Sequence, residues 1–88
     1  MKNFTNAVVV GKKWFQRTYG NTYHSVTIYI DGVTLYEPFT YGYGSHYKQT
    51  AHTLLKKSGY NVPENYTDFL MLDNIVFDEY DVSRKGDL

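Results

Sequence analysis

The sequence predicts an α+β fold, an antiparallel sheet of about four strands with one main helix packed on one face. Residues 22–30 alternate apolar and polar side chains, as a half-buried strand does. Asp31-Gly32 follows immediately and favours a two-residue type I′ hairpin turn. Residues 46–58 then carry apolar side chains at helical spacing and stop at Gly59, which suits the left-handed end of a helix. The expected order of elements is β-β-β-α-β.

The composition restricts the class of protein. A chain of 88 residues forms a single domain, 1–88, and buries only roughly 60–65% of its unfolded surface, so association would add stability. The chain has no cysteine, which excludes disulfides and thiolate metal sites and is expected in a reducing cytoplasm. We find neither a signal-peptide pattern nor an apolar run of the ~20 residues that a membrane helix needs. We therefore expect a cytoplasmic protein with no membrane contact.

The first predicted strand covers residues 7–19. Gly11 interrupts its β-branched run, so we expect a bulge or bend there. Gly20-Asn21 resembles a two-residue type II′ turn, which would place Arg17 opposite His24 and thereby lower the pKa of the histidine. This turn also determines which side chains of the first two strands are neighbours.

The turn at Asp31-Gly32 predicts the pairing of the second and third strands. It places Ile28 opposite Leu35 and Val26 opposite Glu37. Proline has no N–H to donate, so we expect the third strand to bulge or bend near Glu37-Pro38.

The second half of the chain supplies the helix and the last strand. Ser45 is the expected N-cap, and a stripe at helical spacing would cover the sheet: Tyr47, Ala51, Leu54, Leu55 and Ser58. Pro63 would open a short second helix that ends at Phe69 or Leu70. Residues 75–82 read as an edge strand, and residues 83–88 as a flexible tail.

No group of residues in the sequence predicts catalysis. His46 and His52 lie about 120° apart on a helix, which is wrong for one metal ion, and with His24 they read as surface or capping histidines. The segment 41–44 (Tyr-Gly-Tyr-Gly) precedes a helix but lacks the Lys-Ser/Thr of a phosphate loop. We expect its glycines to turn the chain and its tyrosines to pack over the helix start. We therefore expect no catalytic residues, no metal, no cofactor and no enzymatic activity.

The candidate partner-binding surface is the outward face of the sheet. The predicted register places Trp14 beside Thr27, and Thr27 beside Tyr36. A contiguous aromatic patch on a small protein usually marks a contact site. Two alternatives stay open: residues 60–72 fold across this face, or the tyrosines simply suit a β-sheet. The residues expected on it are Trp14, Gln16, Tyr23, Ser25, Thr27, Tyr29, Thr34 and Tyr36.

Charge is segregated along the chain, although the net charge is zero. Residues 1–20 contain no acid and residues 60–82 contain no base. The acids of the last strand and the loop before it would either match a basic, nucleic-acid-binding partner or only solvate a sheet edge: Asp73, Asp78, Glu79 and Asp81. The bases that would form a nucleic-acid flank are Lys12, Lys13, Arg17, Lys48, Lys56 and Lys57. Zero net charge and the acidic segment disfavour nucleic acid as the main ligand.

Several of these stretches occur together in small phage and mobile-element proteins. The segments 20–26 (GNTYHSV) and 39–44 (FTYGYG), with the basic tail 84–88 (RKGDL), resemble that set over most of the chain. Proteins of this kind often inhibit host defences, including CRISPR systems. The resemblance therefore implies a protein that binds and inhibits a host protein or complex. A contact with a host target and the seam of a homodimer are both compatible with the aromatic face.

A second resemblance supports the alternative function. Three strands followed by a glycine-rich entry and a helix are similar to the later part of a double-stranded-RNA-binding domain. This chain lacks that family's first, RNA-contacting helix, and at the helix start it has only Lys48 where the family clusters lysines. The resemblance implies a nucleic-acid-binding module.

Overall fold

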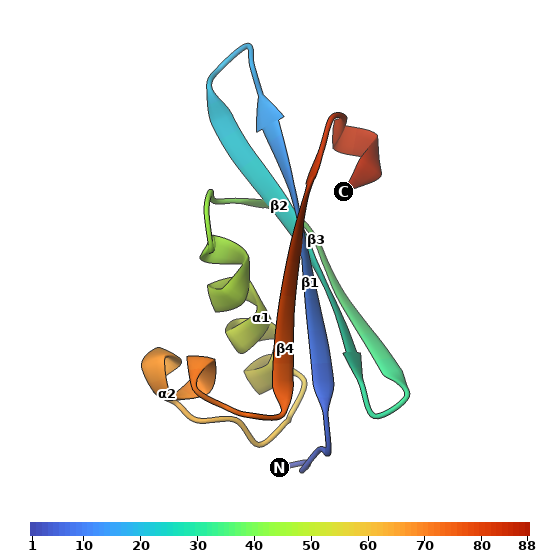
Figure 1. The fold of residues 1–88 in the computed structure, drawn as a ribbon, viewed down its shortest axis with the longest axis vertical. Coiled ribbons are helices and arrows are strands. Elements are labelled where there is room, and N and C mark those ends of the chain that lie inside the picture. Colours follow the sequence, from blue (N-terminus) through green and yellow to red (C-terminus); the bar gives the residue numbers. More distant parts are fainter.

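A four-stranded sheet carries one main helix in the computed structural model, which describes residues 1–88 (Figure 1). The α+β class and the β-β-β-α-β order are confirmed. No helix is both long and apolar enough to cross a membrane. The elements are β1 (Ala7–Gln16), β2 (Asn21–Ile30), β3 (Val33–Tyr41), α1 (His46–Lys57), α2 (Tyr66–Leu70), β4 (Ile75–Val82) and the 3₁₀ turn η1 (Lys85–Asp87).

The sheet has the order β3-β2-β1-β4 and is mixed. The first three strands are antiparallel, whereas β4 runs parallel to β1, with Ala7 paired to Ile75. The expectation of an antiparallel sheet is therefore corrected for the last strand. The reason is the return path: α1, α2 and their connections lead the chain back along the sheet, so β4 starts at the same end as β1 (Figure 1). The expected edge position of β4 is confirmed.

The turn between β1 and β2 differs from the predicted one. The strands are joined by a loop over residues 17–20, in which the N–H of Gly20 donates to the Gln16 carbonyl at 2.9 Å. The longer loop changes the register, so His24 pairs with Lys13 and not with Arg17. The prediction of a two-residue turn at Gly20-Asn21 is wrong.

The second hairpin confirms its predicted turn. Asp31 and Gly32 have φ of 46° and 81°, as a type I′ turn requires. Ile28 pairs with Leu35, as expected. The register then shifts between His24 and Val26, so β3 bulges in the segment that contains Pro38, also as expected.

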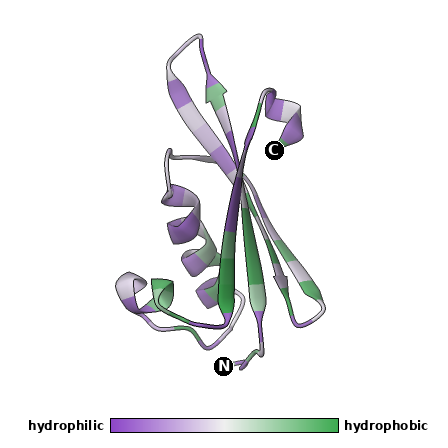
Figure 2. Cartoon of the chain, viewed as in Figure 1, coloured by the Kyte–Doolittle hydropathy of each residue, from purple (hydrophilic) through white to green (hydrophobic).

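The core lies between the sheet and α1. Tyr47, Ala51, Leu54 and Leu55 of the predicted stripe are buried, whereas Ser58 is the C-cap of α1 and is only half-buried. Gly11 does not bulge; β1 pairs continuously through it, and its missing side chain makes room for the Tyr47 ring. Apolar residues concentrate in the part of the sheet beside the two helices (Figure 2).

Both ends of α1 are close to those predicted. Ser45 occupies the N-cap position, but its side chain makes no capping hydrogen bond. At the other end Gly59 has φ of 87°, which confirms the left-handed stop.

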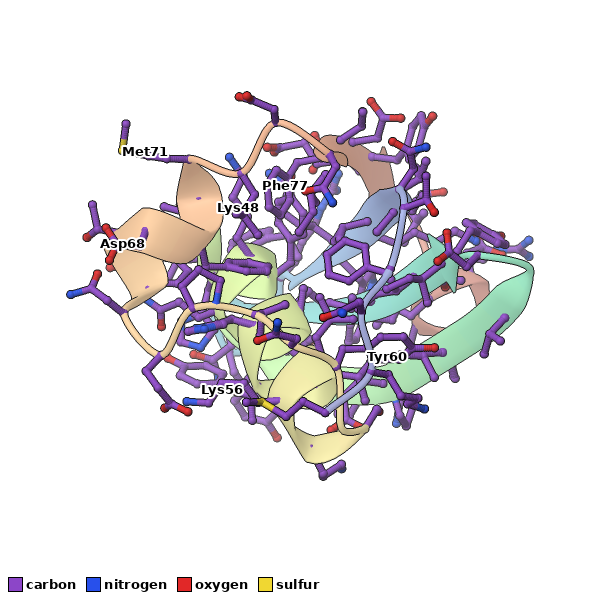
Figure 3. The ribbon with its side chains drawn as sticks, turned by 90° about the horizontal axis from the view of Figure 1, so that it is seen from below. Lys48, Lys56, Tyr60, Asp68, Met71 and Phe77 are labelled. Atoms are coloured by element: carbon purple, nitrogen blue, oxygen red, sulfur yellow. The ribbon has the colours of Figure 1, made fainter.

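Residues 60–72 pack beside α1 and not across the outward face. The helix α2 begins at Tyr66, after the predicted Pro63, because the Asn65 side chain caps it by accepting from the Thr67 N–H at 2.8 Å. Phe69 is fully buried, with its ring centroid 4.5 Å from that of His52 on α1. Figure 3 shows α2 beside α1, with Met71 directed away from the rest of the protein. The outward face is therefore not covered by this segment.

Candidate functional site

The outward face is the side of the sheet opposite α1 and α2, and all four strands contribute to it. Cross-strand pairing gives two rows, Val8 with Tyr29 and Thr34, and Val10 with Thr27 and Tyr36. Tyr29 is 53% exposed and Tyr36 is 51% exposed, although both are large aromatic side chains within strands. The edge strand adds Val76, Asp78, Tyr80 and Val82, which pair with the outward residues of β1. This face therefore exposes aromatic and β-branched side chains side by side.

Four rings form an aromatic cluster at one end of the outward face: Trp14, Tyr23, Phe39 and Tyr41. Tyr23 and Phe39 are stacked with their centroids 4.4 Å apart. Trp14 lies 5.9 Å from Tyr23 and 6.4 Å from Phe39, and the Tyr41 ring meets Tyr23 edge-on at 5.6 Å. Such pairs add about 0.5–1.5 kcal/mol each beyond their burial, so the rings hold one another in place.

Phe39 and Tyr41 belong to this cluster because of the bulge in β3. Glu37 pairs with Val26 on the helix side of the sheet, and after the bulge Thr40 pairs with His24 on that same side. The extra residue reverses the alternation, so Phe39 and Tyr41 face outward. The sequence prediction included the bulge but not this reversal, and it placed Tyr41 over the helix start. Pro38 indicates a bulge, and a bulge of one extra residue would have predicted that Phe39 and Tyr41 face outward.

The last residues of the chain lie against the same face. The Tyr36 hydroxyl donates to the Leu88 carbonyl oxygen at 3.2 Å. The Lys85 Nζ lies 4.6 Å from the centroid of the Phe39 ring. Residues 83–88 thus contact two outward aromatic residues. The predicted flexibility of this tail stays a prediction.

The four candidate acids do not form one surface with the tyrosines. Asp78 lies on the outward face, whereas Glu79 and Asp81 point to the helix side because side chains alternate along β4. There the Lys13 ammonium contacts Glu79 at 2.5 Å and Asp81 at 3.8 Å. The hydrogen bond to Glu79 raises the pKa of Lys13 against the opposing effect of its partial burial, and the charges of both acids add to the increase. Asp73 lies in the loop before β4.

The six candidate bases are not brought together on one flank. Lys12 faces outward, Lys13 faces the opposite side, and Arg17 lies in the loop between β1 and β2. The remaining three are on α1, and each has a partner. Lys56 contacts Glu64 at 3.1 Å, Lys57 contacts Glu37 at 4.0 Å, and Lys48 lies 5.0 Å from the Phe77 ring centroid (Figure 3).

Two of the histidines are buried, which corrects the expectation of surface or capping positions. His24 contacts the Gly42 carbonyl through Nδ1 at 3.2 Å. Because a carbonyl only accepts, Nδ1 carries the proton, and Nε2 accepts from the Thr50 hydroxyl at 2.7 Å. Burial lowers the pKa of His24, as does nearby His46, while the Gly42 carbonyl acts in the opposite direction. His52 donates from Nε2 to the Pro63 carbonyl at 2.6 Å.

A hollow of about 260 Å³ opens beside Thr50 on the helix side of the sheet. Neither it nor any other part of the protein groups three His, Cys, Asp or Glu side chains in a way that would hold a metal ion. Its lining is entirely polar: Glu37, Thr40, His46, Gln49, Thr50 and Thr53. The hydroxyl of Thr50 is already paired with His24, so this pair joins α1 to the sheet.

Comparison of the chain with protein-family models, with curated proteins and with solved structures finds no match.

Proposed function

We propose that this protein acts by binding another protein through the outward face of its sheet. The observation that carries the proposal is an open row of aromatic and valine side chains that α1 and α2 leave uncovered. Tyr29, Tyr36 and Tyr41 are all more than half exposed. Aromatic residues are enriched in the desolvated centres of protein interfaces, where a few of them supply most of the affinity.

The size of the face suits an interface. A half-exposed aromatic ring offers about 100 Å² of surface to a partner, judged from the 150–250 Å² that such side chains bury in full. Together with the valines between them, the outward rings approach the ~800 Å² that a standard interface buries on each partner. A contiguous exposed apolar patch on a small protein usually marks an interaction site, and the outward face has this character.

We further propose that the partner is a host protein or complex, and that the protein is of phage or mobile-element origin and inhibits a host defence of the CRISPR type. This part is supported by the resemblance of the segments 20–26 and 39–44 to such proteins. A cytoplasmic location in the host cell goes with it and stays a prediction. The alternative occupant of the outward face is a second copy of the chain.

Nucleic acid is the less favoured ligand. The phosphate backbone is recognised by clustered cations, whereas Lys13, Lys56 and Lys57 contact carboxylates and lie away from the outward face. A protein partner does not need such a cluster.

The test is a pull-down from host-cell lysate with the parent and with Tyr29→Ala/Tyr36→Ala. The matched control is Tyr19→Ala/Tyr43→Ala, because these tyrosines are 74% and 76% exposed and lie in loops outside the face. We expect the outward pair to lose a partner that the parent and the control both retain. Recovery of the same partner by all three proteins would refute the proposal.

Light scattering on the purified protein comes first, because a monomer rules out the homodimer. Recovered material that consists only of nucleic acid, and is released steeply by added salt, would support the nucleic-acid alternative.

A further inference from the structure

We propose that the aromatic cluster is a seat for a cationic side chain, lysine or arginine, of the protein partner, and that the chain's own tail fills this seat in the unbound protein. The inference rests on the proposed function, because it names the partner's chemistry at the same face. It makes the C-terminal residues an internal competitor of the partner.

The first observation is the contact that the structure already contains. The Lys85 ammonium lies 4.6 Å from the Phe39 ring centroid, within the ~6 Å over which an aromatic quadrupole attracts a cation. Tyr23 is stacked on Phe39 at 4.4 Å and Trp14 packs against both rings. The Phe39 ring is therefore oriented before any ligand arrives, and it remains 44% exposed. A pre-oriented, accessible ring loses little entropy when it binds a cation.

The second observation is that the tail is held weakly. None of the residues of η1 is buried. Two interactions join residues 83–88 to the outward face: the Lys85 ammonium lies over the Phe39 ring, and the Tyr36 hydroxyl donates to the Leu88 carbonyl at 3.2 Å. Exposed contacts of this kind open readily, so a partner can displace the segment.

Trp14 provides the reporter for a direct test. It is the only tryptophan of the chain and is part of the cluster, so its emission follows what happens to the neighbouring rings. The probe is a synthetic acetylated peptide of Gly-Ser-Lys repeats, with a Gly-Ser-Gln peptide as the neutral control. The proteins are the parent, Lys85→Gln, Lys85→Arg and a chain that ends at Ser83.

We expect Lys85→Gln and the shortened chain to bind the lysine peptide about three- to sixfold more tightly than the parent, because an exposed cation–π contact occupies most of the seat in the parent. Lys85→Arg should bind like the parent, since it keeps the internal cation. Phe39→Leu in the Lys85→Gln background should lose the gain. Thermal melts of each variant show that it is folded.

Equal affinities of the parent and Lys85→Gln for the lysine peptide would overturn the proposal. Binding of the glutamine peptide to Lys85→Gln as tightly as the lysine peptide would overturn it too. Tighter binding of oligothymidine than of the lysine peptide to Lys85→Gln would also overturn it. The result is separable from the proposed function. If Tyr29→Ala/Tyr36→Ala recovers the same partner as the parent, but Lys85→Gln binds the lysine peptide more tightly than the parent does, the proposed function fails and the seat stands. If the pull-down depends on that pair and Lys85→Gln changes neither peptide nor partner binding, the seat alone fails.

Discussion

Replacement of Gly11 by alanine tests how the sheet and α1 fit together. A Cβ at this position would lie 2.4 Å from two carbons of the Tyr47 ring and 2.9 Å from a third, where ordinary contacts are 3.4–4 Å. The ring would have to move by about 1 Å, but it is 1% exposed and fixed in the core. Overpacking of this kind costs about 1–3 kcal/mol. The loss of chain entropy in the unfolded state returns about 0.4–1 kcal/mol.

We therefore expect Gly11→Ala to lower the free energy of unfolding by about 1–2 kcal/mol, which corresponds to a decrease in Tm of roughly 5–15 °C for a domain of this size. Urea unfolding followed by circular dichroism measures the first quantity, and a thermal scan the second. Gly86→Ala is the matched control, because a Cβ there meets no atom within 4 Å. It should leave both quantities nearly unchanged.

A double-mutant cycle identifies the cause. In Tyr47→Leu the ring is absent, so Gly11→Ala should cost much less there than in the parent, and the difference is the interaction energy of the pair. An unchanged cost in the Tyr47→Leu background would refute the reasoning, as would a Gly11→Ala variant that melts with the parent. Either result would mean that α1 does not pack over this part of β1.

Two further predictions concern buried polar groups. Ser25 is 1% exposed and its hydroxyl has no hydrogen-bond partner, so Ser25→Ala should raise the free energy of unfolding by about 1 kcal/mol, measured by urea unfolding. The control Ser83→Ala, at an exposed serine, should leave this free energy unchanged. A Ser25→Ala variant that is less stable than the parent would contradict the prediction. The pKa of His24 is lowered in the folded protein, so the unfolded chain binds more protons between the two pKa values. The stability that neutral, buried His24 contributes should be complete above its unfolded pKa of about 6.5. It should be lost as the pH falls through the lower pKa of His24 in the folded protein. His24→Leu should reduce this slope in a series of unfolding measurements at decreasing pH, and an equal slope in both proteins would refute the assignment.

The sequence by itself determined the features whose causes are local. Asp31 and Gly32 favour the positive φ of a type I′ turn because of their own conformational preferences, so the second hairpin and its register could be predicted. The stripe from Tyr47 to Leu55 repeats at the helical period, and Gly59 ends the helix by its own conformational freedom. For the site, alternation along single strands was enough to place Tyr29 and Tyr36 on the outward face.

Only the tertiary structure decided the features that a local sequence pattern does not specify. The loop over residues 17–20 sets the register of β1 against β2 through its length, and this register makes Trp14 the neighbour of Tyr23. The direction of β4 depends on where the helices end, and local propensity for strand contains no direction. Phe39 joins the site because the bulge in β3 reverses the alternation after Glu37, and Lys85 joins it only because the tail returns to that ring. Local patterns fix which face of a strand is apolar, whereas long-range packing fixes which strands and which segments that face meets.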